Sequence, residues 1–279
     1  MKRTGPLYRL FDTLMVALRS TLFQILSILS LTSFVPILLV GNLIPFKRRY
    51  VILFGYGRSV LWLTRHILGI RWEVEGFDRL PEPGGPPPGR LIVSKHQSTW
   101  ETMFLPTELY LASFVLKKEL LWVPIFGAGL KAIRPIAIDR KAGTQALKQI
   151  LKQGKDALAE GRDVIIFPEG TRLPPDAEPD YKIGAAMLAV QAKVPVYPVA
   201  VDSGCLWRKG QFLKRPGTIH VVFGPPIEST GKRADALNAE IKAWIETEQQ
   251  RMYREYGCAA MNDSRNASRD ASGTTSTPD

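Results

Sequence analysis

The feature that most constrains this chain is a run of 27 residues without a charged side chain, from Ser20 to Phe46. A helix of about 20 apolar residues crosses a bilayer, so this run is long enough to do so. Pro36 lies within the run and can bend a helix, because its ring removes a backbone donor and clashes with the preceding turn. The run therefore predicts either a membrane-spanning helix, which is the simpler arrangement, or a hairpin that enters only one leaflet.

Basic residues surround this apolar run. Residues 1–71 hold ten Lys and Arg and a single acid, Asp12, so they carry +9 of the net charge of +11. Positive charge on both sides of the run gives no preferred orientation in a membrane. A second apolar segment, residues 50–70, places Arg58 and Arg65 seven positions apart, which is typical of an amphipathic helix at a membrane surface. We therefore predict a membrane-associated helical region; nucleic-acid binding would explain the charge but not the uncharged run.

The rest of the chain alternates short apolar strands with helical patterns. Strands are predicted at residues 71–76, 91–93, 111–116, 135–140, 163–167, 194–201 and 218–223, and helices at 102–110, 143–160, 182–192 and 234–256. Pro195 and Pro198 interrupt the sixth of these strands. Because a proline cannot donate to a strand ladder, we expect this strand at an edge of the sheet or at a bulge.

His96 follows the predicted strand at 91–93, and Glu101 comes five residues later. A neutral imidazole can take a proton from an alcohol, while a carboxylate holds the imidazole in one tautomer and stabilises the imidazolium that forms. The spacing fits a strand end, a tight loop and the first turn of a helix. Taken alone, such a pair is more often a surface His beside an unrelated Glu, because short motifs match by chance.

Two further strand ends carry side chains suited to an anionic ligand. The strand at 135–140 ends in Asp139 and Arg140, and the strand at 163–167 runs into Pro168 to Arg172. Ligands gather at the carboxyl ends of strands in open α/β sheets, and a planar guanidinium suits phosphate. A glycine next to a threonine hydroxyl also lets the backbone approach a phosphate closely. This is not a Walker loop, since no Gly-Lys-Ser/Thr follows.

The remaining histidines and the two cysteines carry no predicted chemistry. His66 and His220 lie among apolar neighbours and are expected to be structural. Cys205 and Cys258 have no CxxC spacing, so the sequence predicts neither a zinc site nor a disulfide, and a reducing compartment is the simplest interpretation.

Taken in order, four segments resemble the motifs of the glycerolipid acyltransferase family. They are His96-x4-Glu101, residues 138–140, residues 167–172 and residues 194–198. The resemblance covers about residues 90–225, and the Glu-Gly-Thr-Arg block is its most specific part.

The resemblance implies a fold, a reaction and a location. The fold is α/β, a mixed sheet flanked by helices, with an N-terminal hydrophobic membrane-associated helical region. We divide the chain into that region (1–72), a catalytic domain (73–257, motif core 90–225) and a disordered tail (258–279). The reaction moves a fatty acyl group from acyl-CoA or acyl-carrier protein to lysophosphatidic acid, giving phosphatidic acid, without a metal or bound cofactor. The location is the bacterial inner membrane, with the catalytic domain on the cytoplasmic side and with membrane lipid as a partner.

The family's functional residues carry over onto matching positions. His96 would be the general base, and Glu101 stands where the family usually has Asp. Glu is one methylene longer, and its ordinary pKa is close to that of Asp, so its geometry is what the structure must test. Lys95 replaces a more usual Asn or Asp and could lower the pKa of His96. The implied phosphate-binding residues are Arg140, Glu169, Gly170, Thr171, Arg172, Lys118 and Lys131, and the implied acyl or CoA groove includes Pro195 and Pro198.

Two alternatives remain open at this point. The acceptor could be a different lysolipid, such as a lyso-ornithine lipid, with the same motif residues. The chain could also be a membrane lipid-binding protein that has lost catalysis. The Glu at position 101 favours this alternative, and Arg140, Glu169 and Arg172 oppose it.

The apolar segment at 120–127 also has two interpretations. It is either core packing or the wall of an acyl-chain groove.

Overall fold

The structure is a computed structural model that describes residues 6–36, 43–83, 88–124 and 126–258. Its helices are α1 (Pro6–Ser33), α3 (Phe46–His66), α4 (Trp100–Glu108), α5 (Phe126–Ala132), α6 (Thr144–Ala159), α7 (Gly184–Ala192) and α8 (Ala234–Tyr256). Its strands are β1 (Ile70–Glu75), β2 (Leu91–Ser94), β3 (Ser113–Lys117), β4 (Ile136–Ile138), β5 (Val164–Ile166), β6 (Val196–Val201) and β7 (Gly217–Phe223). The predicted disordered tail, apart from Cys258, lies outside the described residues.

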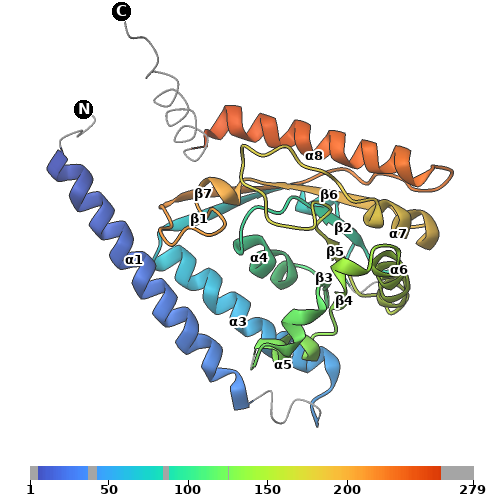
Figure 1. The fold of residues 1–279 in the computed structure, drawn as a ribbon, viewed down its shortest axis with the longest axis horizontal. Coiled ribbons are helices and arrows are strands. Elements are labelled where there is room, and N and C mark those ends of the chain that lie inside the picture. The colour runs from blue at the N-terminus through green and yellow to red at the C-terminus, as the bar shows by residue number, and fades with distance from the viewer. Residues whose placement is uncertain (1–5, 37–42, 84–87, 125, 259–279) are drawn as a thin grey trace, which may run out of the picture.

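The strands form one seven-stranded sheet in the order β1-β7-β6-β2-β5-β3-β4. Among the strand pairs of the described residues, β6–β7 alone is antiparallel, so the sheet is mixed, as predicted. Alternate residues of β2 face opposite sides: Ile92 packs with α3 and α4, whereas Leu91 and Val93 pack with α6, α7 and α8. The buried sheet thus has a helical layer on each face, which gives the predicted α/β architecture (Figure 1).

The N-terminal helices form an antiparallel pair beside the sheet (Figure 1). The Ser30 hydroxyl lies 2.5 Å from that of Ser59, and the ring of Phe34 packs on Tyr56. The apolar part of α1 covers Leu10–Ser33, so the helix begins well before the uncharged run and includes Asp12 and Arg19. The predicted span is therefore shifted towards the N-terminus, because Asp12 and Arg19 leave the segment Leu10–Ser33 apolar on average. Residues 37–42, directly after Pro36, lie outside the described residues.

The strand β6 lies inside the sheet, between β2 and β7, and the prediction that it forms an edge is wrong. Pro195 precedes the strand, where it costs no ladder hydrogen bond. The Pro198 carbonyl accepts from the amide of Gly224, at the point where the neighbouring chain leaves β7. Pro198 thus lies where the regular pairing of β6 with β7 has ended, so the absence of a backbone N–H at Pro198 costs no ladder hydrogen bond.

The two cysteines form a disulfide between Cys205 and Cys258, with Cα atoms 5.1 Å apart. The prediction that these cysteines form no disulfide is therefore wrong. The sequence conceals the pairing because 53 residues separate the cysteines, and only the path of α8 back across the sheet brings them together. The bond joins the segment after β6 to the residue just beyond α8.

Candidate active site

The site forms where four parallel strands end at the same edge of the sheet. The strands β2, β5, β3 and β4 are neighbours and run in one direction. His96 follows β2, and the loop from Phe167 to Arg172 follows β5. Lys117 ends β3, and Arg140 comes just after β4. Parallel strands therefore bring together residues that are far apart in sequence, as expected for ligand sites in α/β sheets.

His96 and Glu101 are paired as predicted. The Nδ1 atom of His96 lies 3.0 Å from Oε1 of Glu101, and the imidazole stacks on Phe167 with ring centroids 4.1 Å apart. Since Nδ1–H donates to the carboxylate, the lone pair of a neutral imidazole is on Nε2. His96 lines the main cavity, so Nε2 is the atom available to a substrate.

The extra methylene of Glu101 is accommodated by folding its carboxylate back over the preceding loop. Glu101 lies in the first turn of α4, and its Oε1 accepts from the amides of Gln97 and Ser98, just before the helix, at 2.7 and 2.6 Å. Oε2 accepts from the hydroxyls of Ser98 and Ser203 at 2.5 and 2.7 Å. Burial raises the pKa of Glu101, but the hydrogen bonds from His96 and Ser98 outweigh it, so the pKa lies below its ordinary value. The carboxylate is held ionised, and position 101 retains its pairing with His96.

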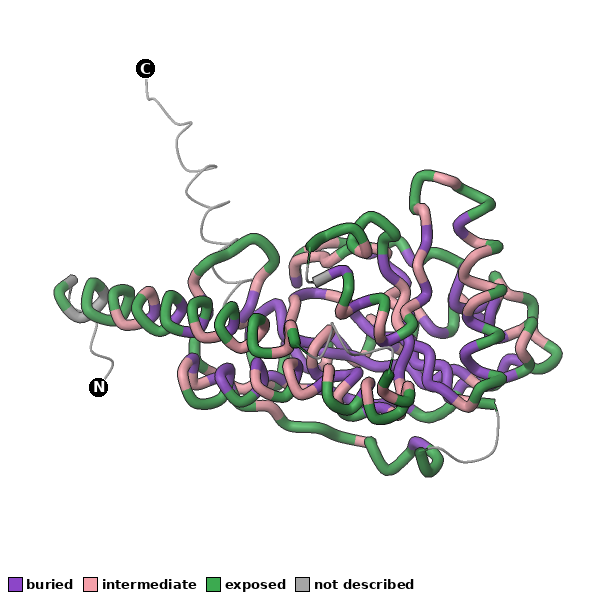
Figure 2. The backbone as a smooth tube through the Cα atoms, turned by 90° about the horizontal axis from the view of Figure 1, so that it is seen from below, coloured by how far each residue is buried: buried purple, intermediate pink, exposed green. Residues whose placement is uncertain are grey.

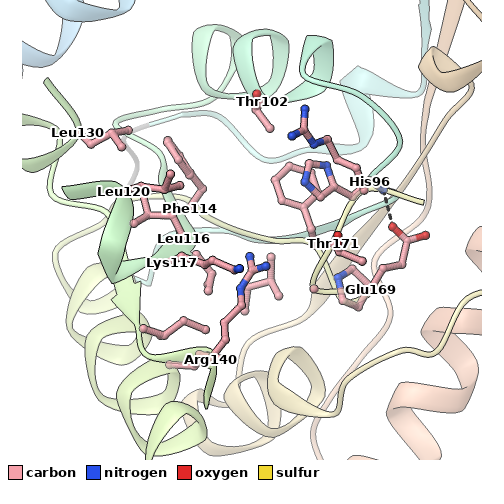
Figure 3. Close-up of a pocket in the computed structure, with 18 of the residues that line it drawn as sticks. His96, Thr102, Phe114, Leu116, Lys117, Leu120, Leu130, Arg140, Glu169 and Thr171 are labelled. Carbon is pink, nitrogen blue, oxygen red and sulfur yellow. Dashed lines mark hydrogen bonds between the residues drawn. The ribbon is translucent and has the colours of Figure 1, made fainter. Parts of the chain in front are cut away.

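A cavity of about 810 Å³ extends from His96 across the carboxyl ends of the strands. Its wall is mostly apolar and is contributed by α1, α3, β3, the segment after β3, α5 and α6, with Leu31, Phe54, Phe114, Leu120, Leu130 and Leu147 among the lining residues. Figure 3 shows Leu116, Leu120 and Leu130 on one side of this space and His96 on the other. Leu120 therefore belongs to the cavity wall, which supports the groove interpretation of segment 120–127 at this residue. Trp122 in the same segment is 79% exposed.

The cationic residues of the cavity differ in part from those predicted. Arg140 and Arg172 line it, as does Lys117, and Figure 3 labels both Lys117 and Arg140 among its lining residues. Lys118 is instead bound to Asp139 at 2.6 Å and does not line the cavity. Lys131 also lies outside the lining, with its ammonium 4.8 Å from the ring centroid of Trp122.

The loop after β5 faces His96. Gly170 has a positive φ of 67°, and no atom lies within 4 Å of the position its Cβ would take, so its backbone is open to the cavity. Nη1 of Arg172 donates to the hydroxyl of Thr99 at 2.6 Å, which holds the guanidinium beside the His96 loop. The hydroxyl of Thr171 accepts from Lys209 at 3.1 Å. Of the residues predicted to bind phosphate, five line the cavity: Arg140, Glu169, Gly170, Thr171 and Arg172.

Glu169 is turned inward and supports the loop that carries His96. Its Oε2 accepts from the backbone amide of His96 at 2.8 Å, and its Oε1 lies 2.8 Å from the ammonium of Lys95. Burial raises the pKa of Glu169 to about 7, against the attraction of Lys95. A carboxylate repels a phosphate, so this geometry favours a supporting role for Glu169 over the direct phosphate contact predicted from the motif.

Lys95, which was hypothesised to act on His96, forms ion pairs with two carboxylates. Its buried ammonium lies between Glu169 and Glu246 of α8, 2.7 Å from the latter, and two carboxylates offset its charge. Pro195 and Pro198 are also absent from the cavity lining; Pro198 packs near Gly224 and Trp244. The groove role predicted for the two prolines is thus not supported by their position.

Several residues of the site were not identified from the sequence. Lys117, Lys182 and Thr99 line the cavity, and Ser203 supports Glu101. The end of β3 was one signal that sequence reasoning missed, since its last residue is Lys117 and not Lys118. For Ser203 the sequence holds no such signal, because this residue lies 102 positions from Glu101. Among the described residues, no group of three His, Cys, Asp or Glu side chains is arranged to hold a metal ion.

Comparison with known proteins shows the family of this chain. The profile of the family described as Acyltransferase matches residues 71–202. A 1-acyl-sn-glycerol-3-phosphate acyltransferase of Pseudomonas aeruginosa is 44% identical over 236 residues, which cover 82% of this chain and 89% of the relative. The chain therefore belongs to the acyltransferase family and is an enzyme of acyl transfer.

More distant relatives share the same description or fold. A 1-acyl-sn-glycerol-3-phosphate acyltransferase alpha of Mus musculus is 31% identical over 185 residues, covering 65% of this chain and 64% of the relative. The crystal structure of the 1-acyl-sn-glycerophosphate acyltransferase of Thermotoga maritima matches with a TM-score of 0.67 at 19% identity, covering 88% of this chain and 97% of that one. The fold of this chain is thus the fold of a solved acyltransferase.

Proposed function

We propose that this enzyme transfers a fatty acyl group from acyl-CoA or acyl-carrier protein to the free hydroxyl of lysophosphatidic acid, producing phosphatidic acid. The observation that carries the proposal is the His96–Glu101 pair at a largely apolar cavity that also holds Arg140, Arg172 and Lys117. Such a cavity suits a substrate with one anionic end and one aliphatic chain. The names of the relatives support the same acceptor.

In the proposed chemistry, the acyl group passes directly from the sulfur of the donor thioester to the hydroxyl oxygen of the acceptor. Nε2 of His96 takes the proton of the acceptor hydroxyl while Glu101 stabilises the imidazolium. The oxygen attacks the thioester carbonyl, forming a C–O bond. The tetrahedral intermediate then collapses, the C–S bond breaks, and the departing thiolate takes the proton from the imidazolium. The reaction uses the donor as a co-substrate, and we propose no metal or bound cofactor.

The cationic end of the cavity would orient the acceptor. Guanidinium groups bind phosphate through paired donors, so Arg140 and Arg172 are the proposed phosphate ligands, with Lys117 as a point charge beside them. The open backbone at Gly170 can approach a phosphate oxygen closely. Holding the phosphate fixes the distance between the acceptor hydroxyl and Nε2, which is how positioning accelerates transfer.

The N-terminal helices would bring the site to its lipid substrates. Much of α1 is exposed (Figure 2). Its outer face carries many exposed large apolar side chains: Leu7, Leu10, Phe11, Leu14, Leu18, Leu22, Ile25, Ile28 and Leu29. The opposite face packs on the protein: Phe23 contacts Trp207 with centroids 5.3 Å apart, and Ser20 accepts from the amide of Lys214. A helix held along one side by polar loops is poorly suited to cross a bilayer. We therefore propose that α1 lies in one leaflet of the inner membrane, with the site on the cytoplasmic side.

The experiment that tests the acceptor offers the purified protein in detergent several lysolipids with one long-chain acyl-CoA. Lysophosphatidic acid, lysophosphatidylethanolamine, lysophosphatidylcholine and lyso-ornithine lipid would be compared, and the same series repeated with acyl-carrier protein as donor. We expect the highest kcat/KM with lysophosphatidic acid, because only its phosphate is an unsubstituted monoester able to meet both arginines. Preferred transfer to another lysolipid would contradict the proposed acceptor and leave the acyl-transfer chemistry in place.

A further inference from the structure

The catalytic carboxylate is supported by a segment outside the four motifs. Both oxygens of Glu101 are buried, and Oε2 accepts from only two side chains in the described structure, Ser98 within its own loop and Ser203. Ser203 opens the short 3-10 helix η5 (Ser203–Cys205), which follows β6. Its side chain is fully buried, so water does not compete for this hydrogen bond.

A second contact fixes η5 against the loop that carries His96. The amide of Gly204 donates to Oε1 of Gln97 at 3.1 Å, while the amide of Gln97 itself donates to Glu101 at 2.7 Å. A Cβ on Gly204 would lie 2.9 Å from Cβ of Gln97, so only glycine permits this approach. The backbone of η5 therefore packs against the side chain of Gln97, and the Ser203 hydroxyl donates to the Glu101 carboxylate.

The C-terminal end of α8 contacts both the loop that carries His96 and η5. Nε2 of Gln97 donates to the hydroxyl of Tyr253 at 2.5 Å, and the disulfide joins Cys205 to Cys258 just past the helix. The C-terminal helix thus contacts both the His96 loop and η5.

We infer that Ser203 is a positioning residue for acyl transfer, which orients the Glu101 carboxylate through its hydroxyl and is itself held by Gly204 and by the end of α8. The inference rests on the proposed role of the His96–Glu101 pair. Ser203 is not among the residues that line the cavity, so its loss should change how well Glu101 aligns His96 and leave both substrates bound as before.

The test compares Ser203→Ala with the full-length parent in the transfer of an acyl group from acyl-CoA to lysophosphatidic acid. Hydrogen bonds to charged groups contribute enough that we expect kcat to fall about tenfold to a hundredfold, with unchanged KM for both substrates. Removing a donor makes the carboxylate more basic and strengthens its pull on the imidazolium. The acid limb of the pH profile of kcat/KM therefore moves to higher pH.

Ser229→Ala is the matched control. Ser229 is also buried, and its hydroxyl donates to the carbonyl of Ala189, away from the cavity. We expect parental kcat and an unshifted pH profile for it. A Ser203→Ala protein that behaves like the parent, or that loses no more activity than Ser229→Ala, would overturn the inference.

Two further variants keep the result interpretable. Gly204→Ala retains the serine hydroxyl but displaces η5, so kcat should fall with KM unchanged; parental activity there would contradict the inference even if Ser203→Ala failed to fold. Glu101→Gln separates the inference from the proposed function. If Glu101→Gln is inactive and both η5 variants are fully active, only the inference fails, whereas a fully active Glu101→Gln removes the proposed catalytic pair itself.

Discussion

At the scale of single residues, two adjacent lysines offer a sharp test of the phosphate end of the cavity. Lys117 lines the cavity, whereas Lys118 is paired with Asp139 outside it. We expect Lys117→Ala to raise KM for lysophosphatidic acid about tenfold or more, because a hydrogen bond to a charged group contributes about 1.5–3 kcal/mol. Lys118→Ala should leave KM within about twofold, since an exposed ion pair contributes little. Steady-state kinetics at fixed acyl-CoA measure both, and equal effects of the two variants would contradict the assignment.

Glu169 predicts a pH dependence of stability. Burial raises its pKa from the ordinary 4.5 to about 7, so between these values the folded protein binds a proton that the unfolded chain does not. The contribution of Glu169 to stability therefore falls as pH rises from about 4.5 to 7. Glu169→Gln lacks this titration, so the stability of the parent relative to the variant should decrease over that window. Urea unfolding at several pH values checks this, and a difference that grows with pH would show that the attraction of Lys95 dominates instead.

At the scale of elements, the sequence predicted most strands and helices and the residues at their ends. Apolar runs such as 91–93 and 163–167 mark buried strands, and the residues after them reach the site because parallel strands end together. What the sequence could not provide is the partner of each side chain. The amide of His96 meets Glu169 across 73 residues, and Ser203 meets Glu101 across 102. These contacts depend on strand order, which local periodicity does not encode.

The placement of α1 gives a prediction at the same scale. Leu18 is on the exposed apolar face of α1, where the proposed membrane contact lies. Leu18→Glu should weaken partitioning into vesicles roughly tenfold, since a charge costs about 2.5–3.5 kcal/mol at the bilayer centre and less near the interface. Lys152→Gln on α6 makes the same change in net charge away from this face and should partition like the parent. Flotation with phospholipid vesicles compares them, and equal partitioning of the three proteins would refute the proposed contact.

At the scale of the whole molecule, charge is concentrated where the membrane contact is proposed. Residues 1–71 carry +9 of the net +11. Each basic residue near an anionic surface contributes about 1 kcal/mol at most, and salt screens this attraction. We expect binding to vesicles containing phosphatidylglycerol to weaken as salt rises and then to level off at the value for neutral vesicles, which reflects the apolar face of α1. Binding that is independent of salt on anionic vesicles would argue against an electrostatic contribution.

The central claim is that His96 is the base in acyl transfer to lysophosphatidic acid. The most direct measurement is phosphatidic acid formation from lysophosphatidic acid and a long-chain acyl-CoA by the purified parent, by His96→Ala and by His66→Ala. His66 is an exposed control that stacks on Trp62 outside the cavity. We predict product from the parent and from His66→Ala, and a fall in kcat of about 10²- to 10⁴-fold for His96→Ala. Parental activity in His96→Ala would contradict the account.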